Sequence, residues 1–284
     1  MKNNERESYF SRKKRKFLQK TVPLLNRVLV ACRWGLRGKL QAKNYEGSVP
    51  LIVSLTSYPP RFPTLHLTLR TLLLQRLKPT RVILWVAHED AASLPMEVTR
   101  LQKEGLEIRH CEDIKSYKKI IPALEAFPHA TIVTADDDIY YWESWLAELV
   151  QESQKYPLDV IAHRVHRIQY KDSTILPYRQ WTERVMDQDA LASNFPTGIA
   201  GVLYPPGCFH PDVLNKDLFM RLCPNADDIW LYWMTRRNGR FSRRSGTKRT
   251  PYPWQGSQEV ALWKENRTDN DLQIVKMLEA YGPP

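Results

Sequence analysis

The sequence has few cysteines, no long apolar run and none of the common phosphate-loop patterns. Its four cysteines show no CxxC spacing, which argues against a structural zinc site and a disulfide framework and fits a reducing compartment. No apolar run approaches the ~18 residues that a membrane span needs, and the N-terminus lacks the pattern of a cleaved signal peptide. GxGxxG and GxxxxGK(S/T) are also missing, so the usual dinucleotide and P-loop sites have no support. We therefore expect a cytoplasmic protein.

The positive charge of the chain is concentrated at one end. The 284 residues carry a formal net charge of +11, and residues 1–49 hold 13 Lys/Arg against 3 Asp/Glu. The rest of the chain is therefore close to neutral. With 43% hydrophobic residues, the chain is long enough for one large α/β domain or two small ones with a sizeable core.

Residues 10–40 combine this positive charge with apolar side chains. The cluster SRKKRK precedes a segment that, as a helix, would show an apolar stripe flanked by arginines. Such a face suits an anionic membrane surface, where each Lys or Arg near the lipid adds roughly 1 kcal/mol. The alternative is a solvated basic tail followed by a helix packed on the main domain. We expect residues 1–48 to form a basic amphipathic extension, peripheral on the inner face of the cell membrane, and we expect no nucleic-acid partner.

From residue 49 onward, buried strands and helices alternate. This alternation predicts an α/β fold with a mostly parallel sheet flanked by helices, and we find no linker that would divide residues 49–284 into two domains. Ligands in such sheets bind beyond the carboxyl ends of the strands. The predicted strands are 49–56, 80–87, 106–113 and 130–135, and the predicted helices are 63–77, 93–105 (capped by Ser93 and ended by Gly105) and 116–127.

Three consecutive aspartates follow the fourth predicted strand, in TIVTADDDIYYWESW, residues 131–145. Adjacent carboxylates repel one another, and burying them is costly unless a positive partner neutralises them. Oxygen ligands of this kind suit Mg²⁺ or Mn²⁺ bridged to substrate phosphates. The alternative is an N-cap, with DIYYWESW as the helix. Capping accounts for one aspartate and leaves two unexplained.

A strand leading into Asp-x-Asp, together with SLTSYPPR, KKIIPAL and ADDDI, resembles the nucleotide-sugar glycosyltransferases of the GT-A fold. The nearest likeness is to bacterial family-2-like enzymes of lipopolysaccharide and capsule biosynthesis, and it covers roughly residues 49–250. The resemblance implies a Rossmann-like sheet and a divalent cation. Asp138 would bind that cation, Asp136 would support it or contact the ribose, and Asp137 would help to hold the loop.

The resemblance also places a nucleotide pocket after the first strand. Its residues would be Thr56, Ser57, Tyr58 and Arg61, which offer hydroxyls, a stacking ring and a guanidinium for phosphate. A rigid Tyr-Pro-Pro turn is the alternative for the middle of this loop. Lys118 or Lys119 would meet the diphosphate, unless these lysines are merely solvated.

A second acidic pair opens the segment NADDIWLYW. In family-2-like enzymes a pair at this place includes the general base, which an inverting transfer needs because a sugar hydroxyl is a poor nucleophile. Asp228 is the expected base and Asp227 its support, with helix capping as the alternative. The motif is also compatible with retention of configuration.

The remaining polar and aromatic residues have two interpretations each. Tyr204, Trp230 and Trp233 would stack on sugars or pack in the core, and the seven cations within residues 236–249 would bind an anionic group or face solvent. The final 74 residues contain no histidine, although GT-A enzymes often supply a late histidine to the metal. An oxygen ligand would replace it, from Asn270 or Asp271, and we expect His163 and His166 to be ordinary packed or surface histidines.

These observations predict a metal-dependent glycosyltransferase, a hexosyltransferase that moves a sugar from a nucleoside-diphosphate donor, UDP being the common expectation. Its acceptor would be a saccharide of a surface polysaccharide or a lipid-linked glycan. One alternative is a nucleotidyl- or phosphotransferase that uses the same aspartates and releases pyrophosphate. Another is a non-catalytic, membrane-associated protein that binds glycan or nucleic acid.

Overall fold

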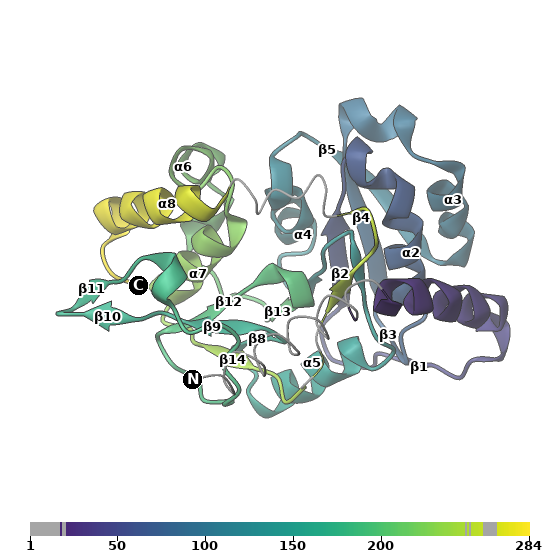
Figure 1. Ribbon diagram of the computed structural model, residues 1–284, viewed down its shortest axis with the longest axis horizontal. Coiled ribbons are helices and arrows are strands. Elements are labelled where there is room, and N and C mark those ends of the chain that lie inside the picture. The colour runs from purple at the N-terminus through teal and green to yellow at the C-terminus, as the bar shows by residue number, and fades with distance from the viewer. Residues whose placement is uncertain (1–17, 19–20, 248, 250, 258–265) are drawn as a thin grey trace, which may run out of the picture.

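The core of the fold is a seven-stranded sheet, seen in a computed structural model that describes residues 18, 21–247, 249, 251–257 and 266–284 (Figure 1). The strand order is β14-β8-β13-β6-β2-β4-β5, and all neighbours are parallel except β13, which is antiparallel to both β6 and β8. The sheet confirms the predicted fold class. Its strands are β2 (Leu51–Thr56), β4 (Arg81–Ala87), β5 (Leu106–Cys111), β6 (Thr131–Thr134), β8 (Val160–Ala162), β13 (Val202–Tyr204) and β14 (Ser242–Arg244).

Helices cover both faces of this sheet, as the uninterrupted apolar strands require. In β2, Leu51, Val53 and Leu55 face one apolar cluster and Ile52 faces the other, because side chains alternate along a strand. The first cluster is completed by α2 (Phe62–Leu73), α3 (Met96–Thr99) and α5 (Trp145–Lys155). The second is completed by α4 (Ile121–Ala126), α6 (Lys216–Leu222), α7 (Asp227–Arg237) and α8 (Asn266–Tyr281).

Short elements connect these layers. The two-residue and three-residue strand pairs are β1 (Lys43–Asn44) with β3 (Leu77–Lys78), β7 (Ile139–Tyr140) with β15 (Tyr252–Pro253), β9 (Val165–Arg167) with β12 (Asn194–Pro196), and β10 (Tyr170–Lys171) with β11 (Thr174–Ile175). The 3₁₀ helices are η1 (Arg37–Lys39), η2 (Pro59–Arg61), η3 (His88–Ser93), η4 (Arg100–Glu104), η5 (Lys115–Lys119), η6 (Tyr178–Gln180), η7 (Gly198–Ala200) and η8 (Pro211–Leu214).

Two helix predictions were wrong in detail. The segment predicted as one helix over 93–105 is divided into η3, α3 and η4, because Pro95 keeps Leu94 extended. Ser93 therefore ends η3 and caps nothing, although Gly105 does follow the last turn. The helix that the capping alternative placed at the aspartates begins instead at Trp145, since Ile139–Tyr140 pairs as a strand with Tyr252–Pro253.

The N-terminal helix, described over residues 21–35 and purple in Figure 1, lies against the main domain. Val30 is buried with Leu67 of α2 and with Trp254. On its outer side the helix exposes Leu24, Leu25, Val28 and Leu29, each 44–66% accessible. Within the described ranges, no helix has both the length and the apolar character that crossing a bilayer would require.

Gly201 fixes the contact between α5 and the start of β13. Its φ is +95°, and a Cβ at this position would lie 2.5 Å from the ring of Trp145, whose indole N–H donates to the carbonyl of Ala200 at 2.7 Å. Gly207 has a similar φ of +66° but open space around the missing Cβ.

We therefore expect Gly201→Ala to lower the free energy of unfolding by at least about 3 kcal/mol, through backbone strain and overpacking together. Gly207→Ala introduces only the backbone strain and should lower the free energy of unfolding by about 1 kcal/mol. Urea denaturation of both variants measures the difference. If both variants lost the same free energy of unfolding, overpacking against Trp145 would have no effect on stability.

Candidate active site

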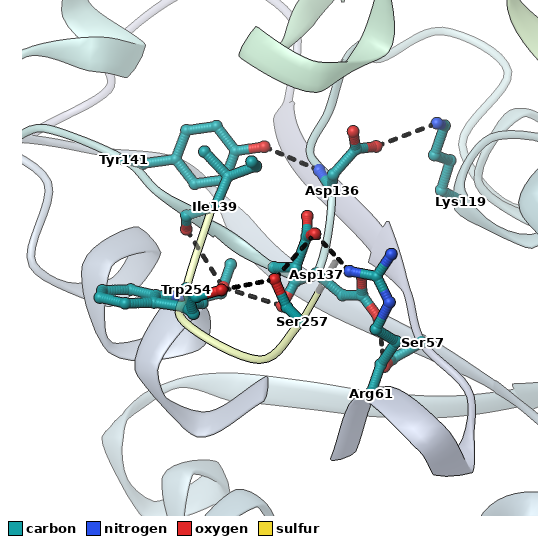
Figure 2. Close-up of polar contacts among 11 residues, drawn as sticks. Ser57, Arg61, Lys119, Asp136, Asp137, Ile139, Tyr141, Trp254 and Ser257 are labelled. Atoms are coloured by element: carbon teal, nitrogen blue, oxygen red, sulfur yellow. Dashed lines mark hydrogen bonds and ion pairs between the residues drawn. The ribbon is translucent and has the colours of Figure 1, made fainter. Parts of the chain in front are cut away.

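The loops after β2 and β6 meet at the carboxyl edge of the sheet, as predicted for two neighbouring parallel strands. Ser57 Oγ donates to Asp137 Oδ2 at 2.5 Å. The Arg61 guanidinium forms an ion pair with Asp138, and its Nη1 lies 3.7 Å from Asp137 Oδ1. Figure 2 shows Asp137 on the side of Ser57 and Arg61, while Asp136 points away from them, toward Lys119.

Asp138 is buried by a segment from much later in the chain. Residues 252–257, which we call the strap, begin with the strand β15 and cross over the aspartates. The backbone N–H of Trp254 donates to the Asp138 carbonyl at 2.8 Å, and Ser257 Oγ donates to Asp138 Oδ2 at 3.3 Å. Burial raises the pKa of Asp138, and the Arg61 charge opposes that rise.

Lys119, buried at the end of η5, joins Asp136 to the second acidic pair. Its Nζ lies 3.2 Å from Asp136 Oδ1 and 3.0 Å from Asp227 Oδ2. Burial alone would lower the pKa of Lys119, but the charges of Asp136, Asp227 and Asp228 outweigh it and raise the pKa well above its usual value. The backbone N–H of Asp136 donates to Tyr141 Oη at 2.7 Å, which fixes the loop at this point.

Asp228 lies in the first turn of α7, where the sequence predicted the second acidic pair to head a helix. Its carboxylate accepts the backbone N–H of Gly198 at 3.1 and 3.2 Å. A Cβ on Gly198 would lie 3.1 Å from Lys119 Nζ and 3.2 Å from Asp228 Oδ1, so a larger residue would push into both groups. Burial, and then the Asp227 charge, raises the pKa of Asp228 to about 7.

The other residues expected in the nucleotide pocket lie near these groups with structural contacts of their own. Thr56 ends β2 and its Oγ1 donates to the Trp85 carbonyl at 2.9 Å. Tyr58 is extended and half-buried immediately before η2. Lys118 is buried in an ion pair with Asp113, so of the two lysines it is Lys119 that reaches the aspartates.

Several aromatic and histidine side chains belong to the core. Trp230 and Trp233 are fully buried, and Tyr204 is buried against Phe209 at 4.9 Å between ring centroids. None of the three is a sugar-stacking surface. His163 is held by Ser245 Oγ at 2.5 Å and the Trp145 carbonyl at 3.0 Å, and burial lowers its pKa to about 4, as expected of a packed histidine.

The candidates for a late metal ligand lie on α8. Asp271 Oδ1 accepts the backbone N–H of Tyr178 at 2.7 Å, so it holds η6 in place. Asn270 Oδ1 is buried without a hydrogen bond. Neither residue makes a described contact with Asp136 or Asp138.

The residues fit a cation held jointly with a substrate diphosphate, and they do not form a metal centre by themselves. No group of three or more His, Cys, Asp or Glu in the described part of the chain could hold a metal. However, Mg²⁺ and Mn²⁺ often use one or two carboxylates together with substrate phosphates. Asp136 is 27% exposed, and its Oδ2 contacts no donor among the residues described. Within the described part of the chain, five aspartates share the two cations Arg61 and Lys119, which leaves an excess of negative charge.

Sequence reasoning missed the parts of this site that come from distant segments. Trp254 and Ser257 of the strap lie more than 100 residues after the aspartates, and no motif marks them. A glycine allows close backbone approach, and Gly198, in the segment GIAGVLYPPG, is where the backbone approaches Lys119 and Asp228. Nothing in the sequence indicated that Tyr141 would anchor Asp136.

We expect Asp228→Asn to stabilise the fold above neutral pH. An aspartate titrates near about 3.9 in the unfolded chain, so between that pH and about 7 only the folded state keeps the Asp228 proton. Stability is therefore lost as pH rises through this window. Asparagine cannot ionise but can still accept the Gly198 N–H.

Urea denaturation at pH 5 and pH 8 measures the effect. The free energy of unfolding of the variant, relative to that of the wild type, should be higher at pH 8 than at pH 5 by on the order of 2 kcal/mol. Asp172→Asn, an exposed carboxyl in the turn between β10 and β11, is the matched control and should show no such gain. If the variant and the wild type differ in free energy of unfolding by the same amount at both pH values, the pKa of Asp228 is not raised.

The fold is similar to several solved structures at low sequence identity. The structure of Staphylococcus aureus TarS 1-349 matches with a TM-score of 0.49 and 14% identity, over 81% of this chain and 66% of that one. TarS 1-349 in complex with UDP-GlcNAc matches with a TM-score of 0.49 and 12% identity, over 81% and 67%. A Bacillus anthracis protein described as a glucose-1-phosphate thymidylyltransferase matches with a TM-score of 0.44 and 11% identity, over 79% and 96%.

This chain therefore spans about two thirds of the TarS fragment, and 40% of a longer TarS structure. No protein-family model matches the sequence, and no curated protein matches it significantly. At these identities the likeness is one of fold alone, a mixed α/β sheet flanked by helices.

Proposed function

We propose that this protein is a glycosyltransferase that moves a sugar from a nucleoside-diphosphate donor to a saccharide acceptor with the help of a divalent cation. One observation carries the proposal. Carboxyl groups from the end of β6 and the start of α7 converge on Lys119 and Gly198, and one of them, Asp228, has a pKa of about 7. A donor-binding edge and a base thus lie side by side.

The donor would bind along the loops after β2 and β6. Thr56, Ser57, Tyr58 and Arg61 offer the polar and aromatic groups that a nucleotide needs, and Asp137 holds Ser57 in position. Asp136 and Asp138 would hold Mn²⁺ or Mg²⁺ together with the donor phosphates. The cation would neutralise the negative charge of the leaving nucleoside diphosphate.

Asp228 would act as the general base. A base is most effective when its pKa lies near the working pH, and a pKa of about 7 meets this condition where an ordinary aspartate does not. The Gly198 N–H orients the carboxylate, and Lys119 keeps Asp227 beside it. Asp228 would take the acceptor hydroxyl proton as that oxygen bonds to the anomeric carbon and the nucleoside diphosphate departs with the electron pair of the broken bond.

Nucleotide binding tests the donor assignment directly. UDP is the first nucleotide to examine, because it is the common donor nucleotide among the enzymes that the motifs resemble. By isothermal titration we expect UDP, and not GDP, to bind in the presence of Mn²⁺ and to lose binding in EDTA. Asp138→Asn should weaken UDP binding at least about tenfold, which corresponds to about 1.4 kcal/mol.

Asp228→Asn is the control, because Asp228 is assigned to the acceptor side and should leave UDP affinity unchanged. Cation-independent binding, or an undiminished affinity in Asp138→Asn, would remove the cation from the proposal. Incubation with UDP-sugars and candidate acceptors then separates the chemistries, since a glycosyltransferase releases UDP and a nucleotidyltransferase releases pyrophosphate.

The N-terminal helix would hold the enzyme at the inner face of the membrane, next to a lipid-linked or surface-polysaccharide acceptor. Its outward face carries Leu24, Leu25, Val28 and Leu29, an exposed apolar strip beside a strongly basic N-terminal segment. Arg33 and Arg37 contribute less to lipid contact than the sequence predicted, because they pair with Glu143 and Glu104 of the main domain.

Sedimentation with vesicles that contain phosphatidylglycerol should capture the wild type, and neutral vesicles should capture far less. The double variant Leu25→Glu, Val28→Glu should bind anionic vesicles at least about tenfold more weakly, because it loses apolar contact. Leu272→Glu places the same charge on a similarly exposed leucine of α8 and should bind normally. Equal capture of all three proteins would reject the helix as the membrane contact.

A further inference from the structure

A small cavity lined by arginines includes Arg164, a residue on which the charge of the candidate base acts. Its volume is about 80 Å³, several times what one water molecule needs. Four arginines line it, and no acidic residue does among its described lining residues: the four are Arg164, Arg184, Arg244 and Arg249. Such a concentration of like charge in one cavity requires an explanation, since arginine cannot neutralise itself by losing its proton.

One of the four arginines is part of the framework. The Arg244 guanidinium donates to the carbonyls of Asp187 at 3.3 Å and Met186 at 2.6 Å, and also to that of Thr247. Its donors are satisfied by backbone oxygens, so it fixes the shape of the cavity wall.

Arg164 is in the opposite situation. Its Nε is buried with no hydrogen-bond partner, and no carboxylate within the described part of the chain forms an ion pair with it. Its one side-chain contact is between Nη2 and His166 Nε2 at 3.3 Å. Burial, and then the nearby Arg184 charge, lowers the pKa of Arg164, which shows how poorly the guanidinium is compensated.

The contact with His166 cannot be a good hydrogen bond. The backbone N–H of Arg184, whose direction is fixed, donates to His166 Nδ1 at 3.0 Å, so Nδ1 must be the acceptor. Burial lowers the pKa of His166 to about 3, so the ring is neutral and carries its one proton on Nε2. A ring N–H therefore faces a guanidinium N–H, and Arg164 lacks an acceptor on this side too.

The backbone around this contact is also strained. Arg184 has a φ of +54°, the left-handed region that non-glycine residues rarely adopt. Strain of this kind persists where the surrounding structure enforces it, and it concentrates at binding sites. Here the strained peptide holds His166 in the tautomer that leaves Arg164 without an acceptor.

The cavity is next to the site of proton transfer. The Arg164 carbonyl accepts the backbone N–H of Thr197 at 3.0 Å, and the next residue, Gly198, donates its N–H to Asp228. The Asp228 charge is among those that act on the Arg164 guanidinium, while Asp228 itself is bound to Gly198. An anion bound by Arg164 would therefore lie within reach of the Asp228 charge, close enough for one acceptor molecule to meet both groups.

We propose that Arg164, with Arg184 and Arg249 beside it, binds the oxyanion of an acidic acceptor and so places the acceptor hydroxyl at Asp228. This rests on the proposed function, in which Asp228 is the base. A phosphate or a carboxylate on the acceptor would supply the oxygens that Arg164 lacks, in the paired geometry that a guanidinium favours. The enzyme would then select acceptors by negative charge.

The test compares three sugars: glucose 1-phosphate, glucuronate and the neutral methyl glucoside. Isothermal titration is carried out with the full-length protein, with and without saturating UDP and Mn²⁺. We expect one or both acidic sugars to bind, and their comparison tells a phosphate site from a carboxylate site. Methyl glucoside should bind at least about tenfold more weakly, and saturating UDP should not displace the acidic sugar.

Three variants assign the binding to Arg164. Arg164→Met should lose at least about tenfold in affinity for the acidic sugar, and Arg100→Met, an exposed arginine of η4, should lose none. Because Arg164 forms no ion pair with any of the described residues, Arg164→Met should melt no lower than the wild type. Arg244→Met should melt several degrees lower, because it loses its contacts to three carbonyls.

Three outcomes would overturn the proposal. If Arg164→Met melts as low as Arg244→Met and keeps its affinity for acidic sugars, Arg164 is structural. If UDP displaces the acidic sugar, the cavity belongs to the donor diphosphate. If neither acidic sugar binds, the cavity is not an oxyanion site, and the separate UDP titration shows whether the proposed function survives.

Discussion

The buried ammonium of Lys119 is the interaction on which the rest of the site depends. Asp136 follows a strand of the parallel part of the sheet, and Asp227 begins a helix on the far side of Gly198. Without a cation between them, these carboxylates would repel each other in an environment that already disfavours charge. Removing one partner of a buried pair typically costs 3–5 kcal/mol. Lys119 therefore keeps the two acidic motifs close together, as the proposed function requires.

Arg61 has a parallel role for Asp137 and Asp138, but the two cations do not balance the five aspartates. The excess negative charge is what makes the site receptive to an added cation, and through it to an anionic donor. The same excess, together with burial, raises the pKa of Asp228 into the range where a carboxylate works as a base near neutral pH. In the proposed function, charge imbalance would thus serve donor binding and proton transfer at once.

Local sequence patterns determined much of this arrangement. The buried runs of β2 and β6 predicted two parallel strands whose polar ends open on the same edge of the sheet, and at that edge Ser57 contacts Asp137. The acidic pair before IWLYW predicted the start of α7. These features follow from periodicity and from the few residue types that occupy strand and helix ends.

Other features depend on tertiary contacts that no local pattern encodes. The residues after Asp138 have helical character, yet Ile139 and Tyr140 form a strand because a segment more than 100 residues away supplies its partner. Lys118 and Lys119 are adjacent and alike, and only the position of Asp113 decides which of them reaches the aspartates. The unsatisfied guanidinium of Arg164 is equally invisible in the sequence, since it arises from a histidine tautomer that a distant peptide imposes.

The strap connects the N-terminal helix to the loop that holds Asp138. Trp254 donates its backbone N–H to Asp138, and its ring packs on Val30 of that helix. Trp254 thus contacts the outward-facing helix through its ring, and Asp138, the residue assigned to the cation, through its backbone. A bilayer that displaced the helix would displace Trp254 as well. Membrane binding and the conformation of the Asp138 loop would therefore be coupled. Removing the helix would therefore alter the surroundings of Asp138 as well as any membrane contact.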